Sequence, residues 1–349
     1  PWVYRALPNK IMQGVTTEIT GNCGFSAAPI VGGHSERFAG VWAREGVEVP
    51  DRVPWRTFEE YRGRMEENGL VTNFVPLVGH GNLRSAVMGF SPRPATQSEI
   101  EEMKALLRQA MQEGAYGISF GLVYLPGLFS ETGELVELCR EAARNIGICA
   151  FHIRGEGAGL VEAVREALEV GEKAQAAIQI SHLKASGKKN WDKIEEAFRL
   201  IEDARYQGVR VAADAYPYTA GFAELGVILP DDLYQREDRV AYFQDLFKRT
   251  QLLDELRDHD DIANVQWDSV MIAATRHERY WRYEGMTFKQ IARKTGKEPE
   301  RFLIEILADT SFEVSAFYFS QSEKVVDQVL SKHYVAVGSD SIADGSRKP

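Results

Sequence analysis

The chain has 349 residues, of which 44% are hydrophobic, and this is enough for one large α/β domain or for such a domain with an insert. No segment is long and apolar enough to cross a membrane. The net charge of −10 comes from acidic and basic residues mixed along the chain, which argues against nucleic acid or an anionic membrane as a partner.

Stretches typical of strands and of helices then alternate along the chain. Strands are predicted at 15–22, 71–78, 116–120, 148–151, 178–181 and 209–213. Helices are predicted at 55–68, from a capping box at Thr96 to Gly114, at 134–144, at 160–174, and after Asn190 as a cap. Strands separated by helical crossovers indicate a parallel sheet with right-handed connections.

The alternation stops near Gly221. The following residues, 221–310, form an irregular insert, and a long insert beside the mouth of a barrel is commonly a lid or a wall of the substrate site. Residues 314–319 fit one further strand, and 335–337 fit the last one. We therefore expect a barrel region at 1–220, an insert or lid at 221–310 and a final barrel unit at 311–349.

Seven of these strands, ending with 335–337, fit a TIM-like (β/α)8 barrel, which has eight. The position left empty is that of the first strand. Because the chain begins at Pro1 instead of methionine and ends in a loop, we expect a fragment that is truncated at both ends.

Four residues of metal-binding types lie directly after predicted strands. They are Cys23, His152, His182 and Asp340, which follow the first, fourth, fifth and last strands. Parallel strands of a barrel end at one mouth, so we expect these side chains to converge there. A thiolate, two imidazoles and a carboxylate suit Zn²⁺, and Asp340 is also a candidate general base. The pattern predicts a metal-dependent hydrolase.

Each of the two histidines has a cationic neighbour. Arg154 and Lys184 lie two positions after His152 and His182 in extended segments, so each points to the same face as its histidine. A cation repels a metal ion, and its expected role is to bind an anionic part of the substrate, such as a carboxylate. For Arg154, an ion pair with a structural carboxylate at the barrel rim is an equal alternative.

These residues belong to an ordered series of motifs that extends over nearly the whole chain. The motifs are Gln13-Gly14-Val15-Thr16-Thr17-Glu18, Gly21-Asn22-Cys23-Gly24-Phe25-Ser26, Phe151-His152-Ile153-Arg154, Ser181-His182-Leu183-Lys184-Ala185-Ser186-Gly187, Asp214-Ala215-Tyr216-Pro217-Tyr218 and Gly338-Ser339-Asp340. The series resembles the D-aminoacylases, which are N-acyl-D-amino-acid deacylases of the metal-dependent amidohydrolase superfamily. The resemblance implies an amidohydrolase-type barrel that hydrolyses the amide bond of N-acyl-D-amino acids, releasing a carboxylate and a free D-amino acid.

The resemblance also implies a tight zinc site at Cys23, His152 and His182, with a zinc-activated water and Asp340 as the catalytic base. The superfamily normally carries a His-x-His pair after the first barrel strand for a second, weaker metal ion. No His-x-His occurs in this sequence, so we expect one tightly bound Zn²⁺. The small β-sandwich of the relatives has no counterpart either.

The lysine that bridges two metal ions in many amidohydrolases is also absent from the matching segment, 117–121, so Cys23 is the candidate that replaces it. Relatives place hydroxyl residues where this chain has Phe222 and Ala223. We expect Lys184, Tyr124 and Tyr218 to contact the substrate instead, with Arg154 as a further candidate.

Three other functions stay open. A cyclic-amide hydrolase of the hydantoinase or dihydroorotase kind would use the same metal chemistry, and a catalytically silent metal-binding fragment would keep the site without turnover. A nucleotide-binding α/β protein ranks last because the sequence has no phosphate-binding glycine loop after a strand. The expected partner is a small N-acyl amino acid, and the oligomeric state is not indicated. Three cysteines do not build a disulfide framework, which favours a cytoplasmic location.

Overall fold

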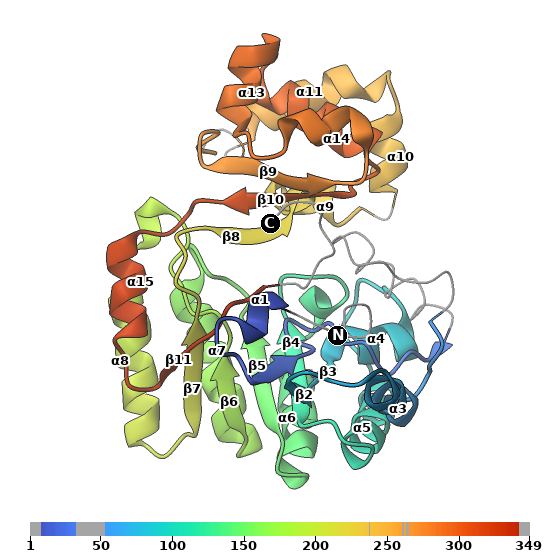
Figure 1. Ribbon diagram of the computed structural model, residues 1–349, viewed down its shortest axis with the longest axis vertical. Coiled ribbons are helices and arrows are strands. Elements are labelled where there is room, and N and C mark those ends of the chain that lie inside the picture. The colour runs from blue at the N-terminus through green and yellow to red at the C-terminus, as the bar shows by residue number, and fades with distance from the viewer. Residues whose placement is uncertain (1–7, 33–52, 237, 260–261, 263–264, 342–349) are drawn as a thin grey trace. The chain divides into compact units, whose positions relative to one another are not determined.

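The structure is a computed structural model that describes residues 8–32, 53–236, 238–259, 262 and 265–341 (Figure 1). These residues divide into two units. The first contains the described residues up to Pro217 and those from Gln321 onward, and the second extends from Tyr218 to Ser320. The second unit therefore ends later than the expected boundary at residue 310, because the strand at Val314–Tyr318 belongs to its sheet.

Parallel strands form the centre of the first unit. They are β1 (Thr17–Thr20), β2 (Asn73–Pro76), β3 (Val78–Gly79), β4 (Gly117–Gly121), β5 (Ile148–His152), β6 (Ala177–Ile180), β7 (Val211–Ala215) and β11 (Val335–Val337). Six of them form one sheet in the order β11-β7-β6-β5-β4-β3, and β1 pairs in parallel with β2. β2 and β3 follow one another along a single path that is interrupted at Leu77, whose N–H donates to the Thr20 carbonyl. This β/α barrel-type order confirms the predicted fold class.

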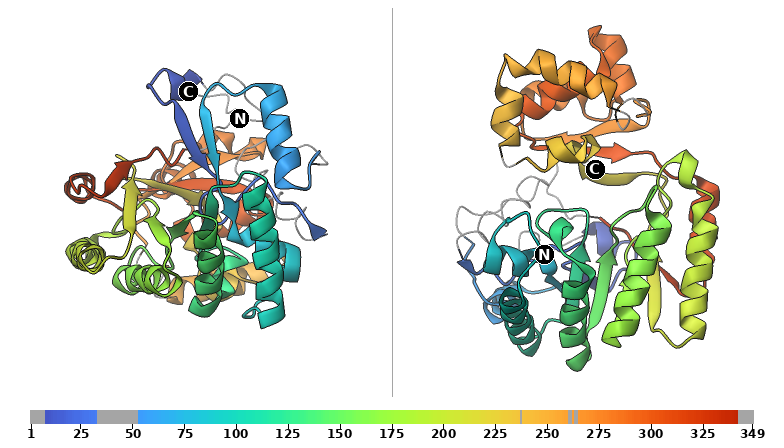
Figure 2. Two further views of the ribbon diagram at one scale, coloured as in Figure 1. Left: turned by 90° about the horizontal axis from the view of Figure 1, so that it is seen from below. Right: turned by 180° about the vertical axis from the view of Figure 1, so that it is seen from behind.

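Helices flank these strands. They are α1 (Pro8–Ile11), α3 (Phe58–Asn68), α4 (His80–Met88), α5 (Gln97–Gln112), α6 (Thr132–Arg144), α7 (Leu160–Ala174), α8 (Lys193–Tyr206) and α15 (Glu323–Leu330), with 3-10 turns η1 (Gly127–Phe129) and η2 (Lys188–Asn190). Helices α5 to α8 pack side by side outside the strands (Figure 2). Each buries an apolar stripe at helical spacing, such as Leu160, Val164 and Leu168 in α7.

Local signals explain where these helices begin. Thr96 caps α5 as predicted, because its hydroxyl accepts a hydrogen bond from the Glu99 N–H. The prediction that Asn190 caps a helix is wrong: its side chain donates to the Ser186 carbonyl at 2.8 Å, and α8 begins at Lys193. Helix α4 was not predicted. Its residues from His80 to Ser85 are all buried, so it lacks the polar face that reveals an amphipathic helix.

The second unit has a sheet and helices of its own. Its strands β8 (Gly221–Glu224), β9 (Val270–Thr275) and β10 (Val314–Tyr318) form an antiparallel sheet in the order β8-β10-β9. Its helices are α9 (Asp231–Tyr234), α10 (Arg239–Gln244), α11 (Lys248–Asp258), α13 (Phe288–Thr295) and α14 (Pro299–Asp309), with 3-10 turns η3 (Leu225–Ile228) and η4 (Glu278–Tyr283). A core that includes Phe243, Phe288 and Phe302 joins helices and sheet. The strand predicted at 314–319 therefore belongs to this unit and not to the barrel.

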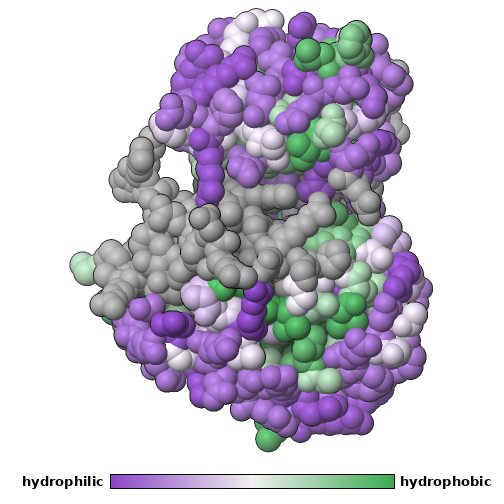
Figure 3. Space-filling model, turned by 90° about the vertical axis from the view of Figure 1, so that its right-hand side faces the viewer, coloured by the Kyte–Doolittle hydropathy of each residue, from purple (hydrophilic) through white to green (hydrophobic). Residues whose placement is uncertain are grey.

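Hydrophilic residues dominate the described part of the face shown in Figure 3, where hydrophobic residues form smaller patches. This distribution agrees with the mixed charges of the sequence. Among the described residues, no helix combines the length and the apolar character needed to cross a bilayer.

The loop after β1 depends on glycine at position 21. Gly21 has φ +75°, and a Cβ atom there would lie 2.2 Å from the Leu77 carbonyl oxygen. We expect Gly21→Ala to lower the free energy of unfolding by about 1–3 kcal/mol or more, because strained backbone and a backbone clash coincide. Gly133→Ala is the matched control, since a Cβ at Gly133 meets no atom within 4 Å. Urea unfolding followed by circular dichroism measures both, and equal stabilities of the two variants would contradict this account.

Candidate metal centre

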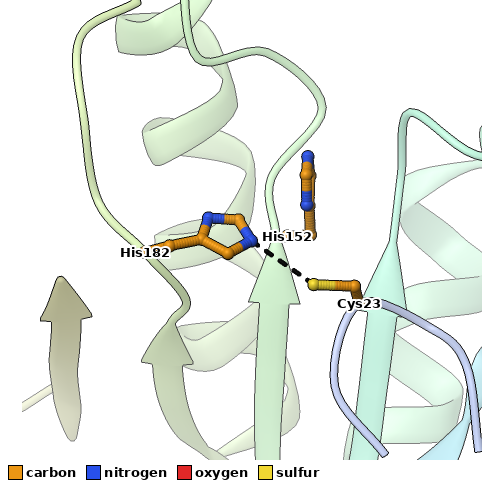
Figure 4. A group of neighbouring side chains, drawn as sticks. All are labelled: Cys23, His152 and His182. Atoms are coloured by element: carbon orange, nitrogen blue, oxygen red, sulfur yellow. Dashed lines mark hydrogen bonds between the residues drawn. The ribbon is translucent and has the colours of Figure 1, made fainter. Parts of the chain in front are cut away.

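Three of the four predicted ligand residues come together at the ends of the parallel strands. Cys23 follows β1, His152 ends β5 and His182 follows β6 (Figure 4). One ligand-type atom from each lies within 4.8 Å of the others. The Cys23 Sγ is 3.3 Å from the His182 Nε2, and the two imidazole rings meet edge to face with centroids 4.4 Å apart. Cys23, which precedes both histidines by more than a hundred positions, thus shares one small volume with them.

The backbone at these residues is unusual. Cys23, His182 and Asp340 all have positive φ, at 55°, 40° and 46°. Non-glycine residues rarely adopt this left-handed conformation, which costs about 1–3 kcal/mol and persists only where the surrounding structure enforces it. Strain at three of the four candidate ligands is a sign of a functional site.

A buried serine holds the turn that carries Cys23. The Ser119 hydroxyl in β4 accepts a hydrogen bond from the Gly24 N–H at 3.1 Å and donates to the Gly21 carbonyl. A Cβ at Gly24 would lie 2.7 Å from the backbone nitrogen of Gly121. The glycines on both sides of Asn22-Cys23 therefore let this loop lie directly against β4.

A second set of hydrogen bonds holds the residues that follow this turn. The Asn82 side chain in α4 accepts from the Ser26 N–H at 2.9 Å and donates to the Ser26 carbonyl at 2.8 Å. The Ser26 hydroxyl in turn accepts from the Gly79 N–H at 2.8 Å. The unpredicted helix α4 thus helps to fix the cysteine loop.

Asp214 in β7 holds the turn at His182. Its carboxylate accepts from the His182 N–H at 2.8 Å and from the Gln179 side chain at 2.6 Å, and its carbonyl accepts from the Leu183 N–H. These bonds stabilise the left-handed backbone at His182 and direct its ring toward Cys23.

The three residues fit a zinc ion by the chemistry of their donors. One sulfur and two ring nitrogens are a common zinc donor set. The His152 Nδ1 is buried and has no hydrogen-bond partner among the described residues. A buried polar atom is normally satisfied, so this nitrogen is suited to a cation. Burial also raises the pKa of the Cys23 thiol, and His182 only partly opposes this. A bound cation would release that proton.

Burial lowers the pKa of His152 to about 3, so the ring is neutral and keeps a lone pair at neutral pH. In the unfolded chain the pKa is near the ordinary value of about 6.5. As the pH falls below about 6.5, the unfolded state takes up a proton that the folded state does not. We therefore expect the metal-free protein to lose stability between about pH 6.5 and pH 4. His152→Asn should lose less over this range in urea unfolding, and an identical loss would contradict the assignment.

A residue that the sequence analysis missed lies beside the histidines. The Glu156 Oε1 is 2.9 Å from the His182 Nδ1, 3.8 Å from the His152 Nε2 and 2.5 Å from the Lys184 Nζ. Burial alone would raise the pKa of Glu156, but Lys184 and the two imidazoles hold it well below its usual value. The available signal was a carboxylate four positions after His152, between Gly155 and Gly157.

The two cationic neighbours differ in their surroundings. Arg154 is bound by both carboxylate oxygens of Glu166 and by the Leu128 and Ser130 carbonyls, at 2.9–3.1 Å. Arg154 thus forms the structural ion pair that was its alternative role, and its role as a substrate contact stays a prediction. Lys184 lies within the site, where its ammonium contacts Glu156, the His182 Nδ1 at 3.0 Å and the His182 carbonyl at 3.2 Å.

The other predicted site residues occupy different places. Asp340 follows β11 and is exposed; it is not one of the three converging residues, but its carboxylate lies close enough to raise the pKa values of Cys23 and Lys184. The Tyr124 ring packs edge to face on His152 with centroids 4.9 Å apart. Tyr218 is exposed at the start of the second unit.

Comparison with known proteins gives a consistent set of relatives. A D-aminoacylase of Alcaligenes xylosoxydans is 37% identical over 217 residues, which are 62% of this chain and 44% of the relative. An N-acyl-D-glutamate deacylase from Bordetella bronchiseptica, crystallised with zinc and a phosphonate mimic of the tetrahedral intermediate, has a TM-score of 0.74 and 28% identity over 95% of this chain and 60% of that one. A D-aminoacylase crystal structure that defines a novel subset of amidohydrolases has a TM-score of 0.71 and 30% identity over 97% and 62%.

No family profile matches the chain. The curated relatives are longer than this sequence. The chain spans 44% of the D-aminoacylase, 58% of an N-acyl-D-aspartate deacylase and 45% of an N-acyl-D-glutamate deacylase. The matched region contains the converging cysteine and histidines together with the strands that carry them.

Proposed function

Because this chain belongs to the D-aminoacylase family of metal-dependent amidohydrolases, we propose that it hydrolyses the amide bond of N-acyl-D-amino acids. The products are a carboxylate and a free D-amino acid. The observation that carries the proposal is the convergence of Cys23, His152 and His182 from three strand ends. The substrate class comes from the names of three curated relatives, a D-aminoacylase, an N-acyl-D-aspartate deacylase and an N-acyl-D-glutamate deacylase.

Cys23, His152 and His182 are the residues that would hold one zinc ion. When bound, zinc supplies Lewis-acid chemistry that polarises a carbonyl group and makes water a nucleophile near neutral pH. The positive φ angles of Cys23 and His182 keep their donor atoms in place before the ion arrives. With the ion bound, the role of the protein would be to hold a thiolate and two neutral imidazoles in one small volume.

Asp340 is proposed as the general base and acid. Its carboxylate takes a proton from the attacking water and later gives it to the leaving amine nitrogen, so that the residue ends the cycle unchanged. Three features support this role: its position after β11, its strained φ of 46° and its electrostatic effect on Cys23. An exposed carboxylate beside the donors can also exchange protons with solvent between turnovers.

Lys184 is proposed to recognise the carboxylate of the substrate. It is buried beside the donor cluster and also lies over the Tyr216 ring, with the Nζ 5.4 Å from the centroid. Tyr124, whose ring packs on His152, would supply a second contact. A cation at this depth favours acyl amino acids over neutral amides.

The test is a substrate panel with zinc-loaded protein. N-acetyl-D-amino acids with neutral and acidic side chains are compared with their L-enantiomers and with hydantoins. We expect release of acetate and D-amino acid only from the D-series. Turnover of hydantoins alone would replace the proposal with a cyclic-amide hydrolase, and bound zinc without any turnover would indicate a silent metal-binding protein.

A further inference from the structure

The four ring nitrogens of the site divide into two sets. We call two of them the inner nitrogens. One is the His182 Nε2, 3.3 Å from the Cys23 sulfur, and the other is the His152 Nδ1, which is buried and has no hydrogen-bond partner among the described residues. The outer nitrogens are the His182 Nδ1 and the His152 Nε2. A single oxygen, Oε1 of Glu156, lies 2.9 Å from the first and 3.8 Å from the second.

The hydrogen-bonded contact selects a tautomer for His182. A neutral imidazole has one N–H, and a carboxylate can only accept hydrogen bonds. The Lys184 ammonium also lies 3.0 Å from the His182 Nδ1, but it has acceptors in Glu156 and in the His182 carbonyl, so we assign the His182 proton to Nδ1, facing Glu156. The His152 Nε2, at 3.8 Å, faces the same carboxylate without a hydrogen bond. The inner lone pairs then remain free to bind a cation together with the Cys23 sulfur.

We propose that Glu156 is the shared positioning residue of the centre, which sets the tautomer of His182 and helps to orient His152. The inference rests on the proposed function, because it assigns the inner nitrogens to a zinc ion. Glu156 does not touch the ion or the substrate, and it acts through His152 and His182.

The same carboxylate also pairs with the lysine of the cluster. The Lys184 Nζ lies 2.5 Å from the same Oε1, and the Glu156 side chain is only 16% exposed. Lys184 therefore links recognition of the substrate to the orientation of the two imidazole rings, because a substrate carboxylate and Glu156 would share its ammonium group.

Zinc affinity, measured by competition with a chromophoric chelator, tests the proposal without reference to turnover. We expect Glu156→Ala to weaken zinc binding about 10–100-fold and Glu156→Gln to weaken it less, since the amide oxygen still accepts one hydrogen bond. Glu166→Gln is the matched control: it breaks the ion pair with Arg154 and touches neither histidine. We expect it to lower stability and leave zinc affinity unchanged.

Nuclear magnetic resonance of histidine ring nitrogens gives a second readout in the metal-free protein, at a pH high enough that the His182 ring is neutral, since its neighbours raise its pKa well above the ordinary value. Seven histidines keep such spectra tractable. We expect the Nδ1–H form of His182 in the unmodified chain and a mixture of tautomers in Glu156→Ala. Should the alanine variant not fold, the isosteric Glu156→Gln still decides the question. Unchanged zinc affinity in the Glu156 variants would overturn this proposal alone, whereas absence of zinc binding by the unmodified chain would overturn the proposed function as well.

Discussion

Replacing Asp340 with asparagine is expected to lower kcat for an N-acyl-D-amino acid by about 10²–10⁴. Asparagine has nearly the same shape as aspartate, but its amide cannot take a proton from water or return one to the leaving amine. The proton transfer is lost while the site keeps its form. Zinc content should remain that of the unmodified protein, since Asp340 lies outside the three converging residues.

Steady-state kinetics on zinc-loaded protein, with metal analysis of the same samples, checks this expectation. The matched control is Asp327→Asn in α15, an exposed aspartate a short distance earlier in the chain. Asp327→Asn should keep full activity. Near-normal turnover by Asp340→Asn with normal zinc content would show that another group moves the proton.

The second large effect is expected for Cys23. Cys23→Ser should reduce zinc affinity by at least about 100-fold, because a direct ligand should matter more than the residues around it. A serine hydroxyl does not become an anion as readily as a thiol, so the site loses its one negatively charged donor. Activity at limiting zinc should fall in parallel, and a chelator should abolish activity that added zinc restores.

Cys139→Ala provides the control for this variant. Cys139 is as deeply buried as any core residue, but it lies in α6 and is not one of the three converging residues. It should bind zinc as tightly as the unmodified chain. Tight zinc binding by Cys23→Ser would mean that the zinc ion uses other donors.

Much of the site was readable from the sequence because of a property of parallel sheets. Each candidate ligand follows a run of strand-forming residues, and parallel strands end at one face, so order along the chain was enough to predict that Cys23, His152 and His182 meet. The glycines around Cys23 also signalled a tight turn, although not its contact with β4.

Other parts depend on contacts that no local pattern reveals. Glu156 is an ordinary loop carboxylate in the sequence, and its role follows from the folding of β5 beside β6. Arg154 and Lys184 occupy equivalent positions after their histidines, yet Arg154 pairs with Glu166 of α7, whereas Lys184 pairs with Glu156 beside the two imidazoles. The strand at Val314–Tyr318 was assigned to the wrong unit because apolar strands have the same composition in a parallel and an antiparallel sheet.

The proposed activity depends above all on one sulfur and two ring nitrogens holding a single zinc ion. X-ray absorption at the zinc edge of the loaded protein measures this directly. We expect one sulfur at about 2.3 Å and two nitrogens at about 2.0–2.1 Å, with the sulfur shell absent in Cys23→Ser. A shell of oxygen and nitrogen alone in the unmodified protein, or a sulfur shell that survives in the variant, would contradict it.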